Sequence, residues 1–111
     1  MVVYFHTSKL QKQCSSKGEA IRKFGPERAK KLMQRLQELE AAENLADIAR
    51  VPPPRCHELK EDRKGQLSVD LQHPYRLLFI PANDPVPQTA EGGLDWEKVT
   101  KIEIVEIEDT H

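Results

Sequence analysis

The spacing of apolar residues changes along the chain and divides it into three parts. The run VVYF at residues 2–5 has the composition of a β-strand. Residues 7–49 then carry apolar positions at helical spacing, and residues 66–109 mostly alternate apolar and polar positions. We therefore expect a short strand, a helical region and an antiparallel sheet, in that order.

Capping residues divide the helical region. Thr7 can cap a first helix, and Ser16 and Glu19 form a capping-box pattern for a second helix or a continuation of the first. Gly25-Pro26 ends this part, because proline is tolerated in the first turn of a helix but not in its interior. The sequence predicts a new helix from Pro26.

The segment PERAKKLMQRLQELEAA at residues 26–42 has the clearest helical pattern in the chain. Its apolar stripe, predicted to face the core, consists of Ala29, Leu32, Met33, Leu36 and Leu39. The positions expected outside the core are Lys30, Lys31, Gln34, Arg35 and Glu38. Asn44 and Asp47 can cap one more turn, and the VPPP run at 51–54 then forces an extended chain.

The second half of the chain has the period of a sheet. QLSVDL at 66–71 and YRLLFI at 75–80 alternate apolar and polar positions on either side of a His73-Pro74 turn, which predicts an antiparallel hairpin. Residues 81–97 hold three prolines and two glycines and predict a long loop, whose end Trp96 should pin to the body. KVTKIEIVEIEDTH at 98–111 is strongly β, but its alternation slips at Val105. Either a bulge occurs there or the strand is buried on both faces.

These elements predict one α+β domain over residues 1–111, with the helices packed on one face of a three- to five-stranded, mainly antiparallel sheet. Nothing in the sequence covers the other sheet face, so we expect ligands or partners to act there.

Composition narrows the class of protein. No apolar run approaches the roughly 20 residues that span a bilayer, and the first residues lack the layout of a signal peptide. Cys14 and Cys56 lie far apart without metal-ligand spacing, which favours a reduced, cytoplasmic protein. No phosphate loop, metal-binding motif or serine-nucleophile motif is present, so we expect no cofactor and no metal site.

The net charge of −1 hides an asymmetry between the two halves. Residues 1–64 hold fourteen Lys and Arg against nine Asp and Glu, whereas residues 65–111 hold three against nine. The basic half can face nucleic acid, or the two halves can attract one another. Both interpretations stay open at this stage.

Acid–base and cationic groups concentrate at three positions. The segment HELKEDRKGQ at 57–66 contains His57 and Lys60, Arg76 lies in mid-strand, and the chain ends in Asp109-Thr110-His111. Each has a structural interpretation: Arg76 in a cross-strand ion pair with Asp70 or Glu103, and the histidines as exposed or terminal residues. Taken together, they suit metal-free RNA cleavage, which needs a base for the 2′-hydroxyl, a cation for the phosphate and an acid for the 5′-oxygen.

Several motifs, in order, resemble the HigB, or plasmid-maintenance killer-protein, branch of the RelE/ParE toxin superfamily. They are KFGPERAKKL, RCHELKEDRKGQLSVDL, YRLLF, GGLDWEKVTKI and the terminal EIEDTH. The resemblance implies a RelE-like fold and a toxin of a type II toxin–antitoxin system that cuts messenger RNA in the ribosomal A site. It also implies a cognate helix-turn-helix, HigA-like antitoxin, through which alone the toxin would reach operator DNA, and no membrane.

The resemblance also assigns roles to individual residues. The catalytic residues it implies are His57, Lys60, Arg76, Asp109 and His111. Thr110 stands at a substrate-contacting position of the family's terminal motif, and we expect Arg63 and Lys64 to bind the RNA backbone nearby. Relatives commonly carry tyrosine where this chain has Thr110, and threonine cannot stack on a base. Which histidine serves as base and which as acid stays open.

Two rival interpretations use the same scaffold. A ParE-like protein would poison DNA gyrase by binding, and a basic helix face would then matter more than the histidines. That face consists of Arg28, Lys30, Lys31 and Arg35. A weakened toxin, kept as an antitoxin-binding regulator, is the third possibility, and Thr110 supports it.

Overall fold

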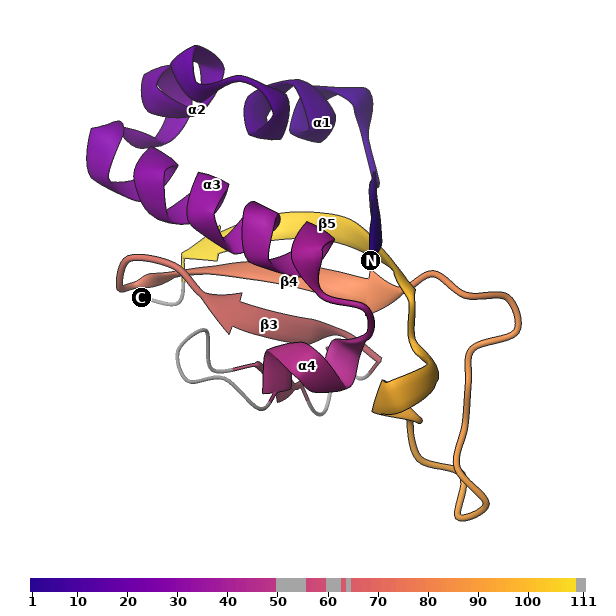
Figure 1. The fold of residues 1–111 in the computed structure, drawn as a ribbon. Coiled ribbons are helices and arrows are strands. Elements are labelled where there is room, and N and C mark those ends of the chain that lie inside the picture. The colour runs from indigo at the N-terminus through magenta and orange to yellow at the C-terminus, as the bar shows by residue number, and fades with distance from the viewer. Residues whose placement is uncertain (50–55, 60–62, 64, 110–111) are drawn as a thin grey trace.

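The structure is a computed structural model that describes residues 1–49, 56–59, 63 and 65–109. It is α+β, as predicted, with helices over one face of a five-stranded sheet (Figure 1). The helices are α1 (Ser8–Ser15), α2 (Lys17–Phe24), α3 (Pro26–Ala41), α4 (Leu45–Ala49) and the 3₁₀ helix η2 (Trp96–Lys98). The strands are β1 (Val2–Phe5), β2 (His57–Glu58), β3 (Leu67–Asp70), β4 (Tyr75–Pro81) and β5 (Lys101–Asp109). The VPPP segment lies outside the described residues.

The helices begin where their capping residues predict. The Thr7 hydroxyl accepts a hydrogen bond from the Leu10 backbone N–H at 3.1 Å and starts α1. The Ser16 hydroxyl accepts from the Glu19 N–H at 3.4 Å and starts α2 as a separate helix. Gly25, with a φ of 86°, ends α2 and lets Pro26 begin α3 at an angle to it. α2 therefore packs back against α3, which lies between it and the sheet (Figure 1).

Arg35 is buried, contrary to the sequence-based expectation. Only 3% of it is exposed, and its Nε donates to the backbone carbonyl of Asp70 at 2.8 Å. Its Nη1 also donates to Glu38 Oε1 at 2.6 Å, one turn along α3. The long aliphatic stem lets the guanidinium cross the core boundary, because its donors meet partners there. Arg35 thus joins α3 to the end of β3.

The sheet has the order β1-β5-β4-β3-β2. β1 is parallel to β5, and the other neighbours are antiparallel, which confirms the predicted hairpin of β3 and β4. The slip at Val105 is a bulge: Phe79 lies opposite Ile104, but Leu78 lies opposite Glu106. One residue of β5 is therefore left without a partner on β4.

The two sheet faces differ in what covers them. Leu77 and Phe79 of β4 are fully buried in the core beneath the helices. On the other face we expected no cover, and at its centre this expectation is wrong: Leu78 is 0% and Ser68 1% exposed. Arg63 lies in the connection between β2 and β3, and its guanidinium reaches β5, so the side chain passes over β4.

The loop after β4 is tied to the body at both ends. Asn83 Oδ1 accepts from the backbone N–H groups of Thr100 and Lys101, at 3.0 and 3.1 Å. Trp96 packs against the core, and its Nε1 donates to Glu58 Oε1 at 2.9 Å, which confirms that it pins the loop. Across the described residues, no helix is both long and apolar enough to cross a membrane.

Replacing Arg35 tests its structural role. Arg35→Ala should lower the free energy of unfolding by about 1.5–3 kcal/mol, because the Asp70 carbonyl loses a charged donor. Gln34→Ala, at the exposed neighbouring position, should change it by less than about 0.5 kcal/mol. Urea unfolding of both variants measures the difference, and equal midpoints would show that Arg35 stabilises nothing.

Candidate functional site

Cross-strand register places His57 and Arg76 on the same face of the sheet. Residues directly opposite one another share a face. His57 of β2 lies opposite Ser68, and Ser68 lies opposite Leu78 of β4. Arg76 is two residues from Leu78 on β4 and points to the same side. This is the face that the helices do not cover, and two of the predicted site residues therefore share it.

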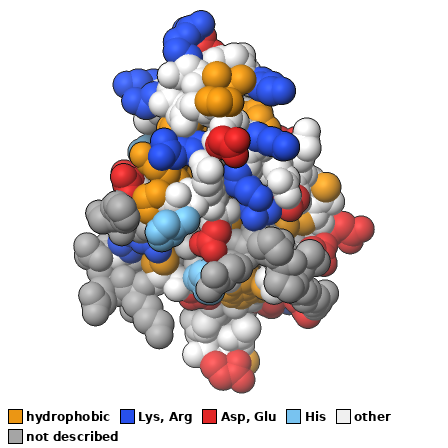
Figure 2. Space-filling view, turned by 90° about the vertical axis from the view of Figure 1, so that its left-hand side faces the viewer, with side chains coloured by type: hydrophobic (Ala, Val, Ile, Leu, Met, Phe, Trp, Pro, Cys, Tyr) orange, Lys and Arg blue, Asp and Glu red, His pale blue; other side chains and the backbone are white. Residues whose placement is uncertain are grey.

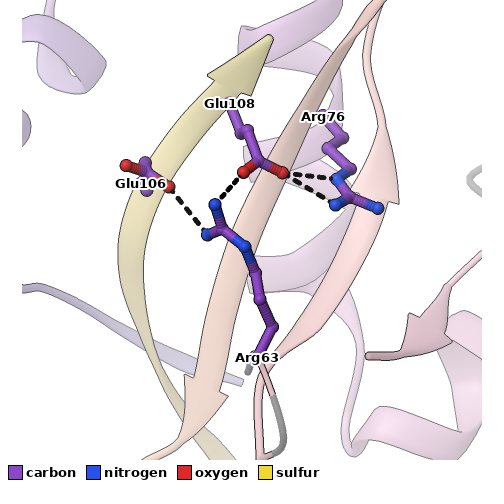
Figure 3. A network of polar contacts seen from close by, with 4 residues as sticks. All are labelled: Arg63, Arg76, Glu106 and Glu108. Atoms are coloured by element: carbon purple, nitrogen blue, oxygen red, sulfur yellow. Dashed lines mark hydrogen bonds and ion pairs between the residues drawn. The ribbon is translucent and has the colours of Figure 1, made fainter. Parts of the chain in front are cut away.

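A carboxylate on the last strand holds Arg76 (Figure 3). Glu108 lies opposite Arg76, and its Oε2 accepts from Arg76 Nε at 2.9 Å and pairs with Nη2 at 2.7 Å. The other oxygen, Oε1, pairs with Nη2 of Arg63. Arg63 Nη1 also pairs with Glu106 Oε2 at 3.1 Å. Two arginines and two glutamates thus form a neutral network over β4 and β5.

This network corrects the structural interpretation of Arg76. A cross-strand ion pair was foreseen with Asp70 or Glu103, and the pair that forms is with Glu108. Sequence reasoning missed Glu106 and Glu108, because the bulge at Val105 determines which residues of β5 lie opposite β4. The slip in alternation at Val105 was the one signal of a bulge, but it did not show which residues would lie opposite Arg76.

Asp109 does not join this group. It lies opposite Tyr75, which packs against the core on the helix side of the sheet. The side chain of Asp109 therefore points away from the face that carries Arg76. The resemblance implies a catalytic role for both residues, but alternation places their side chains on opposite faces of the sheet. Four other predicted site residues lie outside the described residues, namely Lys60, Lys64, Thr110 and His111.

A hollow of about 410 Å³ adjoins the network on the same face. Arg63 and Glu106 form one side of it, and Ile80 contributes an apolar wall. On the far side, His6 Nδ1 and Glu103 Oε2 lie 2.9 Å apart. The hollow is wide enough for part of a nucleotide, and its rim offers both donors and acceptors.

The basic helix face is smaller than the sequence suggests. Lys and Arg side chains gather over the helical layer in the view of Figure 2. Arg35, however, is buried, and the Arg28 guanidinium lies 4.1 Å above the ring of Tyr75. Of the four residues proposed for that face, Lys30 is exposed and Lys31 half-buried.

The two cysteines are free thiols with little thiolate character. Burial raises the pKa of the Cys14 thiol to about 11. Burial and the nearby Glu58 carboxylate raise the pKa of the Cys56 thiol to about 12. Both effects disfavour the anion, so neither cysteine is suited to act as a nucleophile at neutral pH.

Comparison with known proteins identifies a family that matches most of the chain. A family model described as RelE-like toxin of type II toxin-antitoxin system HigB matches residues 4–89. The match includes His57, Arg63 and Arg76, while β5 with Glu106 and Glu108 lies beyond it. A search of curated proteins found none that matches the chain.

Thiol alkylation tests the environment of the cysteines. At pH 8, iodoacetamide should modify Cys14 and Cys56 more than about tenfold more slowly in the folded chain than in guanidinium, because the raised pKa values leave little thiolate. The folded chain holds these protons more tightly than the unfolded chain does. Their contribution to stability is therefore complete below about pH 9 and is lost as the pH rises toward 12.

A Cys14→Ser variant isolates Cys56 in the same experiment. Alkylation of Cys56 at the rate of the unfolded chain would contradict the buried environment described for it.

Proposed function

Because the chain belongs to the HigB-like family of RelE-like toxins, we propose that it is an endoribonuclease that cuts messenger RNA on the ribosome. It is a toxin of a type II toxin–antitoxin system. The reaction we propose is metal-independent and uses the RNA 2′-hydroxyl as the nucleophile. In this proposal the whole chain, residues 1–111, acts as one toxin domain.

The observation that carries the proposal is that His57, Arg63 and Arg76 lie on one face of the sheet. His57 and Arg76 are two strands apart, and each strand spacing is about 4.8 Å. They are also offset by two residues along the strands, about 7 Å, so the two side chains would flank a phosphodiester from either side. A fixed guanidinium charge and an imidazole on the same face supply the cation and the proton-transfer group that the reaction needs.

A histidine removes the proton of the 2′-hydroxyl, whose oxygen attacks phosphorus. Arg76 stabilises the charge that develops on the phosphate oxygens. The bond from phosphorus to the 5′-oxygen breaks, and a second acid donates a proton to that oxygen. The products are a 2′,3′-cyclic phosphate and a free 5′-hydroxyl.

Other residues enter the proposal through the family resemblance. Lys60 and Lys64 would add positive charge near the phosphates, and His111 would be the second proton-transfer group. Thr110 would contact substrate without stacking on a base. Asp109 lies on the helix side of the sheet, so we assign it no substrate contact.

The ion pairs favour a second candidate function, that of a catalytically weakened toxin. Glu108 and Glu106 neutralise the two arginines on this face. A toxin weakened in catalysis, and kept for antitoxin binding, would tolerate such neutralisation. The ParE-like alternative loses support, because Arg35 is buried and Arg28 is held over Tyr75.

The partners follow from the proposed activity. The substrate would be messenger RNA in the ribosomal A site, which places the protein in the cytoplasm. The toxin family implies a cognate antitoxin, and we propose a helix-turn-helix protein of the HigA type. Operator DNA would be bound through that antitoxin.

Mapping RNA 5′ ends after induction in cells tests the proposed activity. New ends should appear within translated messages, and Arg76→Ala should reduce them by about 10²–10³-fold because the phosphate charge loses its stabilising donor. His57→Gln should reduce them by about 10²–10⁴-fold through lost proton transfer. Lys30→Ala, exposed on α3 in the opposite layer, is the matched control and should cut normally.

Three results would count against the proposal. Cleavage that survives Arg76→Ala would remove the assigned role of that residue. DNA damage with intact messages would favour gyrase poisoning, and no growth defect at all would favour the weakened toxin.

A single modified nucleotide tests the nucleophile. A message with one 2′-deoxyribose immediately 5′ of the cut phosphate should resist cleavage at that position in reconstituted ribosomes, because the attacking oxygen is missing. Cleavage should persist in EDTA-treated samples that keep the ribosomes intact with polyamines. Cutting at the deoxy position would show that water or another group attacks instead.

A further inference from the structure

Glu108 is held between two guanidinium groups in a way that its neighbour Glu106 is not. Its Oε2 accepts a hydrogen bond from Arg76 Nε at 2.9 Å and pairs with Arg76 Nη2 at 2.7 Å. Its Oε1 pairs with Arg63 Nη2. The side chain of Glu108 is only 16% exposed, whereas that of Glu106 is 51% exposed and contacts Arg63 at one point. The Glu108 carboxylate therefore has a different arginine on each oxygen.

A phosphodiester presents the same features to these donors. It has two charged non-bridging oxygens, and arginine forks bind such oxygens with paired N–H groups. Arg63 and Arg76 come from different parts of the chain, one from the connection before β3 and one from β4, yet both point at one spot above β5. That convergence defines a subsite for one oxyanion.

We propose that Glu108 occupies the phosphate subsite in the free protein and competes with the RNA phosphate for Arg63 and Arg76. This inference rests on the proposed function and adds how the site is regulated. RNA must displace the carboxylate before either arginine can reach the scissile phosphate. Glu108 is therefore an internal competitor that keeps the affinity of the free toxin for phosphates low.

Electrostatic repulsion explains why a phosphate cannot bind the two arginines while Glu108 remains in place. With Glu108 in place the four side chains sum to zero charge, and an approaching phosphate meets two carboxylates. When Glu108 swings away, Arg76 loses the carboxylate that holds it, and the phosphate replaces that carboxylate. The apparent affinity for phosphate is then the intrinsic affinity multiplied by the fraction of molecules in which the subsite is open.

The test is Glu108→Gln, which keeps the size of the side chain and removes its charge. Binding of inorganic phosphate, and of a trinucleotide RNA with 2′-O-methyl groups that prevent cleavage, is followed through the Arg63 and Arg76 Nε–Hε signals in NMR spectra. If the subsite is open in a tenth of wild-type molecules or fewer, Glu108→Gln should tighten binding by about tenfold or more. Glu106→Gln is the matched control and should change it by less than about threefold.

Unchanged or weaker binding by Glu108→Gln would overturn the inference, because Glu108 would then only orient the arginines. The wild-type chain supplies a second measurement if the variant does not fold. Phosphate should shift the Glu108 carboxyl carbon signal together with the Arg76 Nε–Hε signal, and binding that leaves the carboxyl signal in place would overturn the proposal.

The outcome is separable from that of the nuclease assay, since phosphate binding needs no ribosome. Tighter binding by Glu108→Gln without any message cleavage in cells would contradict the proposed function alone. Message cleavage with unchanged phosphate affinity would contradict the competition alone.

Discussion

The bulge at Val105 is the constraint on which the arrangement of the site depends. Ile102 and Ile104 face the helices before it, and Ile107 packs against the same core after it. An uninterrupted β5 would place Ile107 opposite Arg76 and turn Glu106 and Glu108 toward the apolar core. Burying two carboxylates there would be costly, whereas one unpaired residue lets both glutamates meet arginines on the other face. The hydrophobic pattern of β5 and the ion pairs of the site therefore require the same irregularity.

The remaining contacts hold this register in place. β5 lies between β1 and β4, and its pairing with β1 over Lys101–Ile104 fixes the part before the bulge on both edges. Arg35 fastens α3 to the carbonyl of Asp70, the residue of β3 opposite Arg76. The helical layer thus supports the strand pair that carries the candidate site, and the charged side chains lie on a backbone that the core holds rigid.

Much of the fold could be predicted from sequence, because its signals are local. Thr7, Ser16 and Pro26 mark helix starts through capping and proline geometry, and the hairpin of β3 and β4 follows from alternation around one turn. The burial of Arg35 could not be predicted, since its partner is a carbonyl 35 residues away. The pairing of Glu108 with Arg76 depends on where the bulge falls, and the slip at Val105 indicated that a bulge was possible but not which residues it would bring together.

In the proposed site, the charge of the phosphate subsite is balanced internally until RNA arrives. Family membership establishes a toxin, and the shared face of His57, Arg63 and Arg76 supports the proposed chemistry. The convergence of Arg63 and Arg76 on Glu108 depends on the register of β4 and β5. Cross-strand backbone NOEs in solution measure that register directly. We expect contacts that pair Arg76 with Glu108 and Phe79 with Ile104 in the same molecule, and a pairing of Arg76 with Ile107 would overturn the proposed site.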